Sequence, residues 1–208
     1  MLIIILLLVI VAVIVLSAQG SSAKSKGQQG EKRVIAHAAK HLDEKKYTVL
    51  NNCTFQINAQ LTTQIDHIVV SRFGVFVIET KNYQGWIFGD EHQKMWTQKL
   101  YKKSYQFQNP LHQNYRHIKA LQDILHGVVE PEYLHSVVVF VGDSQFKTPM
   151  PNHVLQGQDW IQYVKSFQDE VLSSVKMQRI CQTLEKHALE KSRKTDAMHV
   201  KNLKKYHG

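Results

Sequence analysis

Residues 64–81 read QIDHIVVSRFGVFVIETK. Two runs rich in Ile, Val and Phe, residues 64–70 and 75–81, are typical of β-strands. They are separated by the four residues Ser71 to Gly74, which are long enough only for a tight connection. The stretch therefore predicts an antiparallel hairpin.

The predicted hairpin gathers three charged side chains. Pairing of Val70 with Val75 sets Asp66 opposite Glu79, and alternation along the second strand adds Lys81 to the same face. Like charges placed opposite each other destabilise a sheet, and a carboxylate among aliphatic side chains must be paired or bind a metal. Mg²⁺ would resolve this conflict, and Lys81 would then orient water or offset negative charge at a phosphoryl group. A plain surface ion cluster is the alternative.

The residues before the hairpin predict a helix and a further strand. Apolar side chains recur at helical spacing over residues 31–42 (Val34, Ile35, Ala38 and Leu42). Glu31 heads this apolar face. It is either an acid that favours the helix dipole or a further carboxylate directed at the charged patch. Residues 47–57 read as a strand rich in Thr, Val, Phe and Ile.

The residues after the hairpin complete an α/β pattern. Residues 86–88 are expected to extend the sheet, and Asn109 is a suitable cap for a helix over residues 110–126. The continuously apolar residues 136–141 predict a strand covered on both faces. Residues 159–191 are expected to be mostly helical. This order predicts an α/β fold with a mixed sheet flanked by helices.

The charge of the chain points to an anionic partner. The 208 residues carry a net charge of +9, which suits nucleic acid or an anionic membrane surface. Residues 186–208 form a basic tail that either is a solvated end or binds phosphate. Lys102 and Lys103 lie among aromatic residues, a mixture that suits nucleic-acid binding by stacking and phosphate contact, or an ordinary loop.

The first residues form an apolar leader. Residues 1–16 are uniformly apolar, and residues 17–20 bring the run near the ~20 residues that a bilayer requires. No basic residue precedes the run, and a good cleavage box is absent, so a secretory signal peptide is disfavoured. The basic residues that follow favour a cytoplasmic domain. We predict a transmembrane anchor over 1–20 and a flexible linker over 21–29. A cleaved leader and a secreted protein are the alternative.

Several motifs in order resemble one known family. Gly30-Glu31, residues 65–70, residues 74–82 with Gly85, and Asn-Pro-Leu-His-Gln at residues 109–113 are similar to the NERD (nuclease-related) domain. That domain belongs to the PD-(D/E)xK nuclease superfamily. The resemblance spans residues 28–141, and the complete string is more specific than the Asp…Glu-x-Lys core alone. Ile65 stands where the superfamily usually has Pro, at a position that varies.

The resemblance implies a restriction-endonuclease-like core, with the order α-β-β-β-α-β, and phosphodiester cleavage that depends on Mg²⁺ or Mn²⁺. By matching position, Asp66 and Glu79 are the expected metal ligands. Lys81 is expected to assist the water, and Glu31 to be the acid on the helix. Gln113 is expected to contact the site or the nucleic acid.

These expectations assign residues 30–185 to the nuclease-like domain and residues 186–208 to the tail. The leading hypothesis is a membrane-anchored, metal-dependent nuclease that acts on DNA and faces the cytoplasm. The alternative is a catalytically silent module that binds nucleic acid or a protein at the membrane.

Overall fold

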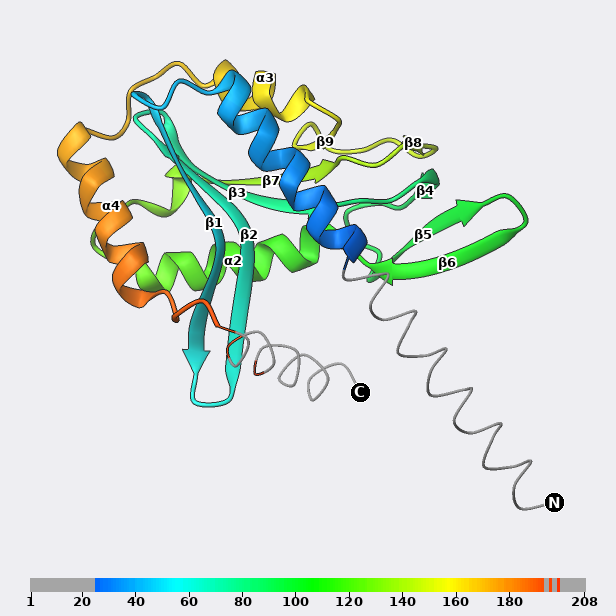
Figure 1. Ribbon diagram of the computed structural model, residues 1–208, viewed down its shortest axis with the longest axis horizontal. Helices are drawn as coiled ribbons and strands as arrows, with labels where there is room; N and C mark the ends of the chain where they lie inside the picture. The colour runs from blue at the N-terminus through cyan, green and yellow to red at the C-terminus, as the bar shows by residue number, and fades with distance from the viewer. Residues whose placement is uncertain (1–24, 193–194, 196–197, 199–208) are drawn as a thin grey trace.

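The structure is a computed structural model that describes residues 25–192, 195 and 198. The predicted anchor over residues 1–20 and most of the basic tail lie outside the described residues. Within the described part of the chain, no helix is both long and apolar enough to span a membrane. The fold is α/β with flanking helices, as the sequence predicts, but its strands form two sheets (Figure 1).

The larger sheet has five strands in the order β1-β2-β3-β7-β9. β1, β2 and β3 are antiparallel neighbours, whereas β7 and β9 continue the sheet in parallel. The strands are β1 (Tyr47–Asn58), β2 (Leu61–Ser71), β3 (Gly74–Lys81), β7 (Leu134–Phe140) and β9 (Val154–Gln156). The predicted mixed sheet is therefore present.

The β2–β3 hairpin has the predicted register. Val70 pairs with Val75, and Ser71 pairs with Gly74, so only two residues form the turn itself. The paired valines are fully buried. Because side chains alternate along strands, this register fixes which residues at the other end of the hairpin face the same side.

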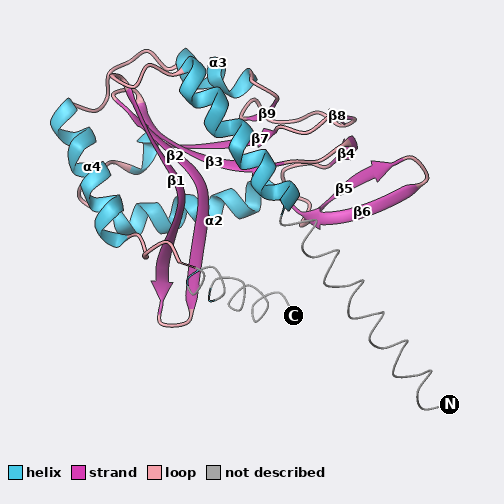
Figure 2. Ribbon diagram, viewed as in Figure 1, coloured by secondary structure: helices cyan, strands magenta, loops and turns pink. Residues whose placement is uncertain are grey.

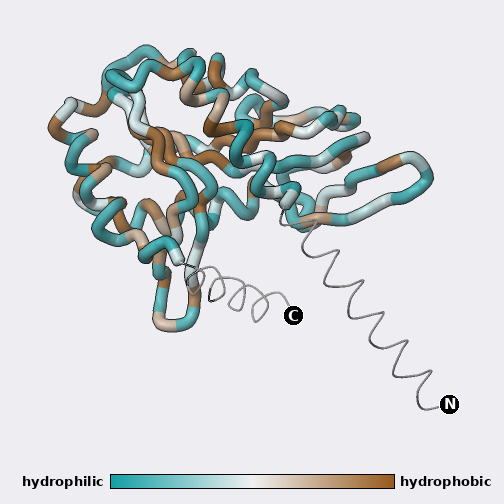
Figure 3. Tube along the Cα trace, viewed as in Figure 1, coloured by the Kyte–Doolittle hydropathy of each residue, from teal (hydrophilic) through white to brown (hydrophobic). Residues whose placement is uncertain are grey.

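Helices cover both faces of the larger sheet (Figures 1 and 2). They comprise residues 25–41, α2 (Pro110–Ile124), α3 (Asp159–Ser166) and α4 (Ser174–His187), with a short 3₁₀ helix η1 (Pro131–Tyr133) before β7. The first helix and α3 pack on one face, and α2 and α4 pack on the other. Figure 3 shows the apolar strands between these layers. Asn109 caps α2 as predicted, because its side chain accepts a hydrogen bond from the Leu111 amide at 2.9 Å.

A second sheet of four strands, in the order β6-β5-β4-β8, stands beside the first. Its strands are β4 (Gly85–Phe88), β5 (Met95–Leu100), β6 (Lys103–Gln108) and β8 (Ser144–Phe146). The prediction that residues 86–88 extend the larger sheet is therefore wrong. Gly85 has a φ of +77°, and a Cβ there would lie 2.5 Å from the Lys99 carbonyl oxygen, so the chain turns away at a point that only glycine tolerates.

Two boundaries differ from the sequence expectation. Residues 25–29, expected in a flexible linker, instead form the start of the first helix, because Lys26, Gln28 and Gln29 are good helix formers and outweigh the cost of Gly27. At the other end, the Leu189 amide donates to the Thr54 carbonyl at 2.8 Å and Lys191 Nζ donates to the Asn51 carbonyl at 2.8 Å. The folded domain thus continues past residue 185 into the segment expected to be a tail.

Candidate active site

A buried ion pair lies at the end of β3. Lys81 Nζ donates to Glu79 Oε1 at 2.8 Å and to Gln113 Oε1, on α2, at 3.0 Å. The Glu79 side chain is 2% exposed and that of Lys81 is 15% exposed. The sequence placed Glu79 and Lys81 on one face of the sheet, and that face is the one that α2 covers. The structure therefore brings together three of the predicted site residues.

His117 is a neighbour that the sequence reasoning missed. Its Nε2 lies 3.2 Å from Glu79 Oε2, and its Nδ1 lies 2.6 Å from Thr63 Oγ1. His117 follows Gln113 by four residues, a spacing that places both on one face of a helix. That spacing was the available signal. Both oxygens of Glu79 are thus held by side chains from β3 and α2.

Asp66 adds a second carboxylate to the cluster. Its Oδ2 accepts a hydrogen bond from the Thr80 amide at 2.8 Å, which links β2 to the residue between Glu79 and Lys81. Burial raises the pKa of the Asp66 carboxyl well above its usual range, and the negative charge of Glu79 raises it further. The Thr80 hydrogen bond opposes these effects only in part.

Glu79 and Lys81 stabilise each other in their charged forms. Burial alone would raise the pKa of Glu79, but the Lys81 ammonium and His117 outweigh burial and lower that pKa to about 2. Burial disfavours the Lys81 ammonium, and the charge of Glu79 overcomes this and raises the pKa of Lys81. Asp66 is therefore the member of the cluster that has no full counter-charge of its own.

Glu31 stands at the margin of this cluster. It lies on the first helix and is partly exposed, and its charge contributes to the raised pKa of Asp66. At Gly30, directly before Glu31, the helix passes very close to the end of β3, because a Cβ on Gly30 would lie 2.8 Å from Cβ of Asn82. This close approach brings the part of the first helix that carries Glu31 beside the end of β3.

A cleft of about 730 Å³ opens beside Lys81. Its walls come from the first helix, from the segment after β3 and from the β5–β6 hairpin, with Lys26, Arg33, Tyr83, Gln98 and Tyr105 among the lining residues. Burial raises the pKa of Tyr83, and the charge of Lys81 acts in the opposite direction. Tyr83 is therefore close to the cluster, although the sequence reasoning did not select it. The cleft gives a solute access to the buried ion pair.

Lys102 and Lys103, predicted to contact nucleic acid, lie at the tip of the β5–β6 hairpin and are exposed. Lys103 pairs with Leu100, which lines the cleft, but neither lysine lines it. The hairpin projects from the body of the molecule (Figure 1). The structure places these two lysines beyond the rim of the cleft, away from the ion pair.

The residues of the cluster fit a hard divalent cation in part. Asp66 and Glu79 supply carboxylate oxygens, the ligands that Mg²⁺ prefers together with water and substrate phosphate. Burial raises the pKa of Asp66 and repulsion from Glu79 raises it further, and a bound cation would relieve both effects. Among the described residues, however, no group of three or more His, Cys, Asp or Glu side chains is arranged to hold a metal.

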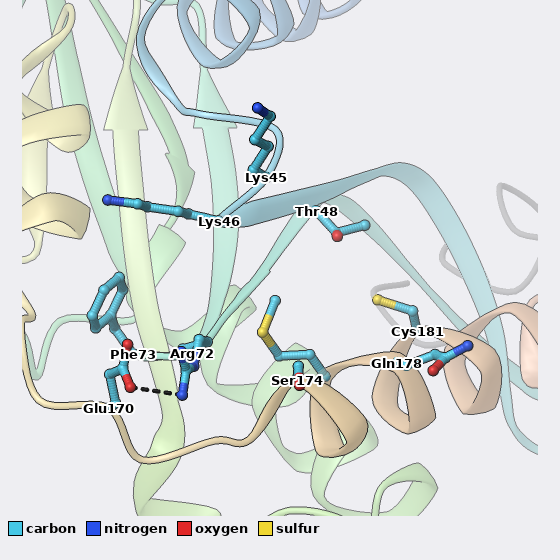
Figure 4. A pocket seen from close by; sticks show the side chains of 10 residues that line it. Lys45, Lys46, Thr48, Arg72, Phe73, Glu170, Ser174, Gln178 and Cys181 are labelled. Carbon is cyan, nitrogen blue, oxygen red and sulfur yellow. Dashed lines mark ion pairs between the residues drawn. The ribbon is translucent and has the colours of Figure 1, made fainter.

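A second pocket is lined by Lys45, Lys46, Arg72 and residues of α4, among others (Figure 4). Arg72 Nη2 pairs there with Glu170 Oε2 at 2.7 Å. This pocket adjoins the turn of the β2–β3 hairpin, at the opposite end from Lys81. None of the predicted site residues lines it, so it plays no part in the candidate site.

Comparison with known proteins identifies the family. The model of the nuclease-related domain matches residues 26–141, more than half of the chain. The chain belongs to the NERD family. An uncharacterized protein of Bacillus anthracis is 41% identical over 165 residues, which cover 77% of this chain and 76% of that protein. No solved structure matches the chain.

The NERD match covers the whole candidate site. Residues 26–141 include the first helix, the β2–β3 hairpin, the small sheet up to β6, α2 and β7. α3 and α4 lie outside the match, and they complete the cover of the larger sheet. The charged cluster therefore belongs to the part that this chain shares with the family, as does the cleft beside it except for Gly142 and Asp143.

Proposed function

We propose that this NERD protein is a metal-dependent nuclease that hydrolyses phosphodiester bonds, with DNA as its substrate and Mg²⁺ or Mn²⁺ as its cofactor. The observation that carries the proposal is the buried Glu79–Lys81 ion pair, hydrogen-bonded to Gln113 and adjoined by Asp66. Burying an ion pair beside a further carboxyl is costly, so a functional reason for keeping these groups together is expected. Membership of a nuclease-related family supports the same reading.

Each residue has a distinct part in this proposal. Asp66 and Glu79 would hold the cation, which when bound polarises the phosphoryl group. Lys81 keeps its proton because Glu79 favours the ammonium, so it presents a fixed positive charge where negative charge develops on phosphate. Gln113 and His117 hold Lys81 and Glu79 in place. Glu31 is the acid at the edge of the site.

A cleavage assay tests this assignment. The full chain, in a non-ionic detergent, is incubated with DNA and RNA in Mg²⁺ or Mn²⁺. Asp66→Asn and Lys81→Ala are each expected to lower the rate by about 10²–10³-fold, as loss of a preorganised electrostatic group does elsewhere. Asp66→Asn keeps an acceptor for the Thr80 amide. Exposed Asp123→Asn and Lys119→Ala on α2 are the matched controls, and equal rates for all four variants would refute the site.

A binding module without cleavage is the second candidate. One observation favours it: both oxygens of Glu79 are already engaged, by Lys81 and by His117. If the wild-type chain binds nucleic acid but cleaves neither DNA nor RNA in either metal, this candidate replaces the first.

We also propose that the leader tethers the domain to a membrane with the domain on the cytoplasmic side. The uniformly apolar residues 1–16 and the basic residues that follow support this proposal. The expected result is a chain that remains in the membrane pellet after an alkaline wash and is released when residues 1–20 are deleted. A mature chain that begins near Gln19 would overturn the tether.

A further inference from the structure

The cleft beside Lys81 has a positive wall. Lys26 and Arg33 stand on the first helix, and Asp143 is the one carboxylate that faces them among the lining residues. Arg33 is held in place, because its Nη1 donates to the Val141 carbonyl at 2.8 Å. The Lys26 carbonyl accepts a hydrogen bond from Asn82 Nδ2 at 2.7 Å. This wall therefore presents two cations to a solute that carries phosphate, and the Arg33 guanidinium is fixed by a hydrogen bond.

The opposite wall presents an aromatic ring. Tyr105 lies on β6, the edge strand of the small sheet, and is 48% exposed. Its cross-strand partner is Gln98, which lines the same cleft. Tyr105 is thus on the side of the hairpin that lines the cleft, and its exposure shows that its ring is not packed into the hydrophobic core.

The Tyr105 ring also lacks the cation–π contacts that two other exposed rings make. Within the described part of the chain, no other aromatic ring and no ammonium group lies against it. Two comparable exposed rings are covered: Lys99 and Lys147 lie over Trp86, at 5.8 and 4.9 Å from the ring centroid, and Lys119 lies over Tyr115 at 5.5 Å. Tyr105 therefore offers a π-face that a planar ligand is able to reach.

We infer that this cleft takes a single nucleic-acid strand, with a base stacked on Tyr105 and its phosphates against Lys26 and Arg33. The inference rests on the proposed function and names its substrate class. Aromatic stacking combined with a basic groove is the usual way in which proteins bind single strands. Within a duplex each base face is covered by its neighbours, so a strand with unpaired bases is required. The cleft leads such a strand to Lys81.

Equilibrium binding without metal tests the inference. Fluorescence anisotropy of the full chain in EDTA is measured with a single strand, a blunt duplex of the same sequence, and an abasic strand of the same length. The single strand is expected to bind most tightly. Tyr105→Ala should weaken its binding roughly 5- to 150-fold, the range for losing one stacked base, while Tyr105→Phe should bind as the wild type does.

The controls separate stacking from general charge. Tyr115→Ala, at an exposed tyrosine outside the cleft, should change nothing, and the abasic strand should not distinguish Tyr105→Ala from the wild type. Duplex binding equal to or tighter than single-strand binding would overturn the inference. So would equal single-strand affinities for Tyr105→Ala and Tyr115→Ala. DNA and RNA strands of one sequence, compared in parallel, identify which sugar the cleft accepts.

The outcome is independent of cleavage. Because the binding assay contains no metal, it measures the contribution of Tyr105 to affinity even if the protein never cleaves nucleic acid. Failure of the nuclease proposal appears as binding without cleavage, whereas failure of this inference appears as cleavage or binding that does not depend on Tyr105.

Discussion

The two sheets of this protein differ in what covers them. β3 and β7 of the larger sheet lie between helices and are buried along most of their length. β6 of the smaller sheet is an edge strand, and residues 103–106 are exposed without interruption. Figure 3 shows the same contrast, with apolar central strands and a mostly hydrophilic β5–β6 hairpin.

This difference separates two tasks. The charged cluster needs a scaffold that holds Glu79 and Lys81 away from bulk water, because electrostatic interactions are stronger there. Binding of a long nucleic-acid strand instead requires accessible aromatic rings and cations on the protein surface. Trp86, Met95, Tyr101 and Tyr105, which are half of the large exposed apolar side chains among the described residues, all belong to the smaller sheet or its turn. We therefore expect chemistry from the first sheet and binding from the second.

The largest expected effect comes from breaking the junction between the sheets. Phe140 of β7 is fully buried, and its ring lies 6.2 Å from Trp96 and 5.1 Å from Phe146. Phe140→Ala should lower the free energy of unfolding by ~3–5 kcal/mol, as expected for a buried aromatic residue. Denaturant unfolding measures this. Trp86→Ala, at an exposed ring, is the control, and similar losses for both variants would contradict the proposed junction.

The next effect concerns the buried ion pair. Lys81→Met leaves Glu79 without its counter-charge and should cost about 3 kcal/mol, the lower end for breaking a buried pair, because His117 remains. Adding Glu79→Gln should recover most of this loss, and the two single variants complete a double-mutant cycle. Exposed Lys119→Met should change the stability by no more than ~0.5 kcal/mol. A double variant that is as unstable as Lys81→Met would argue against the coupling.

A smaller effect is expected at the tip of the hairpin. Replacing both Lys102 and Lys103 with Ala should weaken single-strand binding and reduce the slope of log K against log salt by about 0.7 for each phosphate that these lysines neutralise. Titrations at several salt concentrations measure the slope. The Lys45→Ala/Lys46→Ala pair, from the pocket in Figure 4, removes equal charge elsewhere. Equal changes in slope for both pairs would show that only net charge matters.

The smallest effect is a pH dependence of the larger sheet. Burial lowers the pKa of His135, whose ring packs 5.0 Å from Phe76 and 4.4 Å from Phe167. A lowered pKa means that the unfolded chain binds the proton more readily. The stability from the neutral ring is therefore complete above the unfolded pKa of about 6.5 and is lost as the pH falls below it. His135→Phe should flatten this loss in thermal unfolding at several pH values, whereas exposed His126→Phe should not.

Much of the larger sheet was predictable, because its signals are local. The paired valines set the hairpin register, Asn109 and the following Pro mark the start of α2, and the apolar residues 136–141 mark β7. The smaller sheet was missed because its strands are short and its residues are polar or mixed. Residues 86–88 resemble any short strand, and which sheet they join depends on the turn at Gly85.

The α/β class and the common face of Glu79 and Lys81 follow from local sequence patterns, because strand alternation and a tight turn leave little choice. The sequence also selected Gln113 through its resemblance to a family. Only the tertiary structure decided that His117 holds the second oxygen of Glu79 and that Thr80 binds Asp66. The cleft walls likewise required the first helix and a distant hairpin to meet. Such contacts join residues far apart in the chain, so no local pattern encodes them.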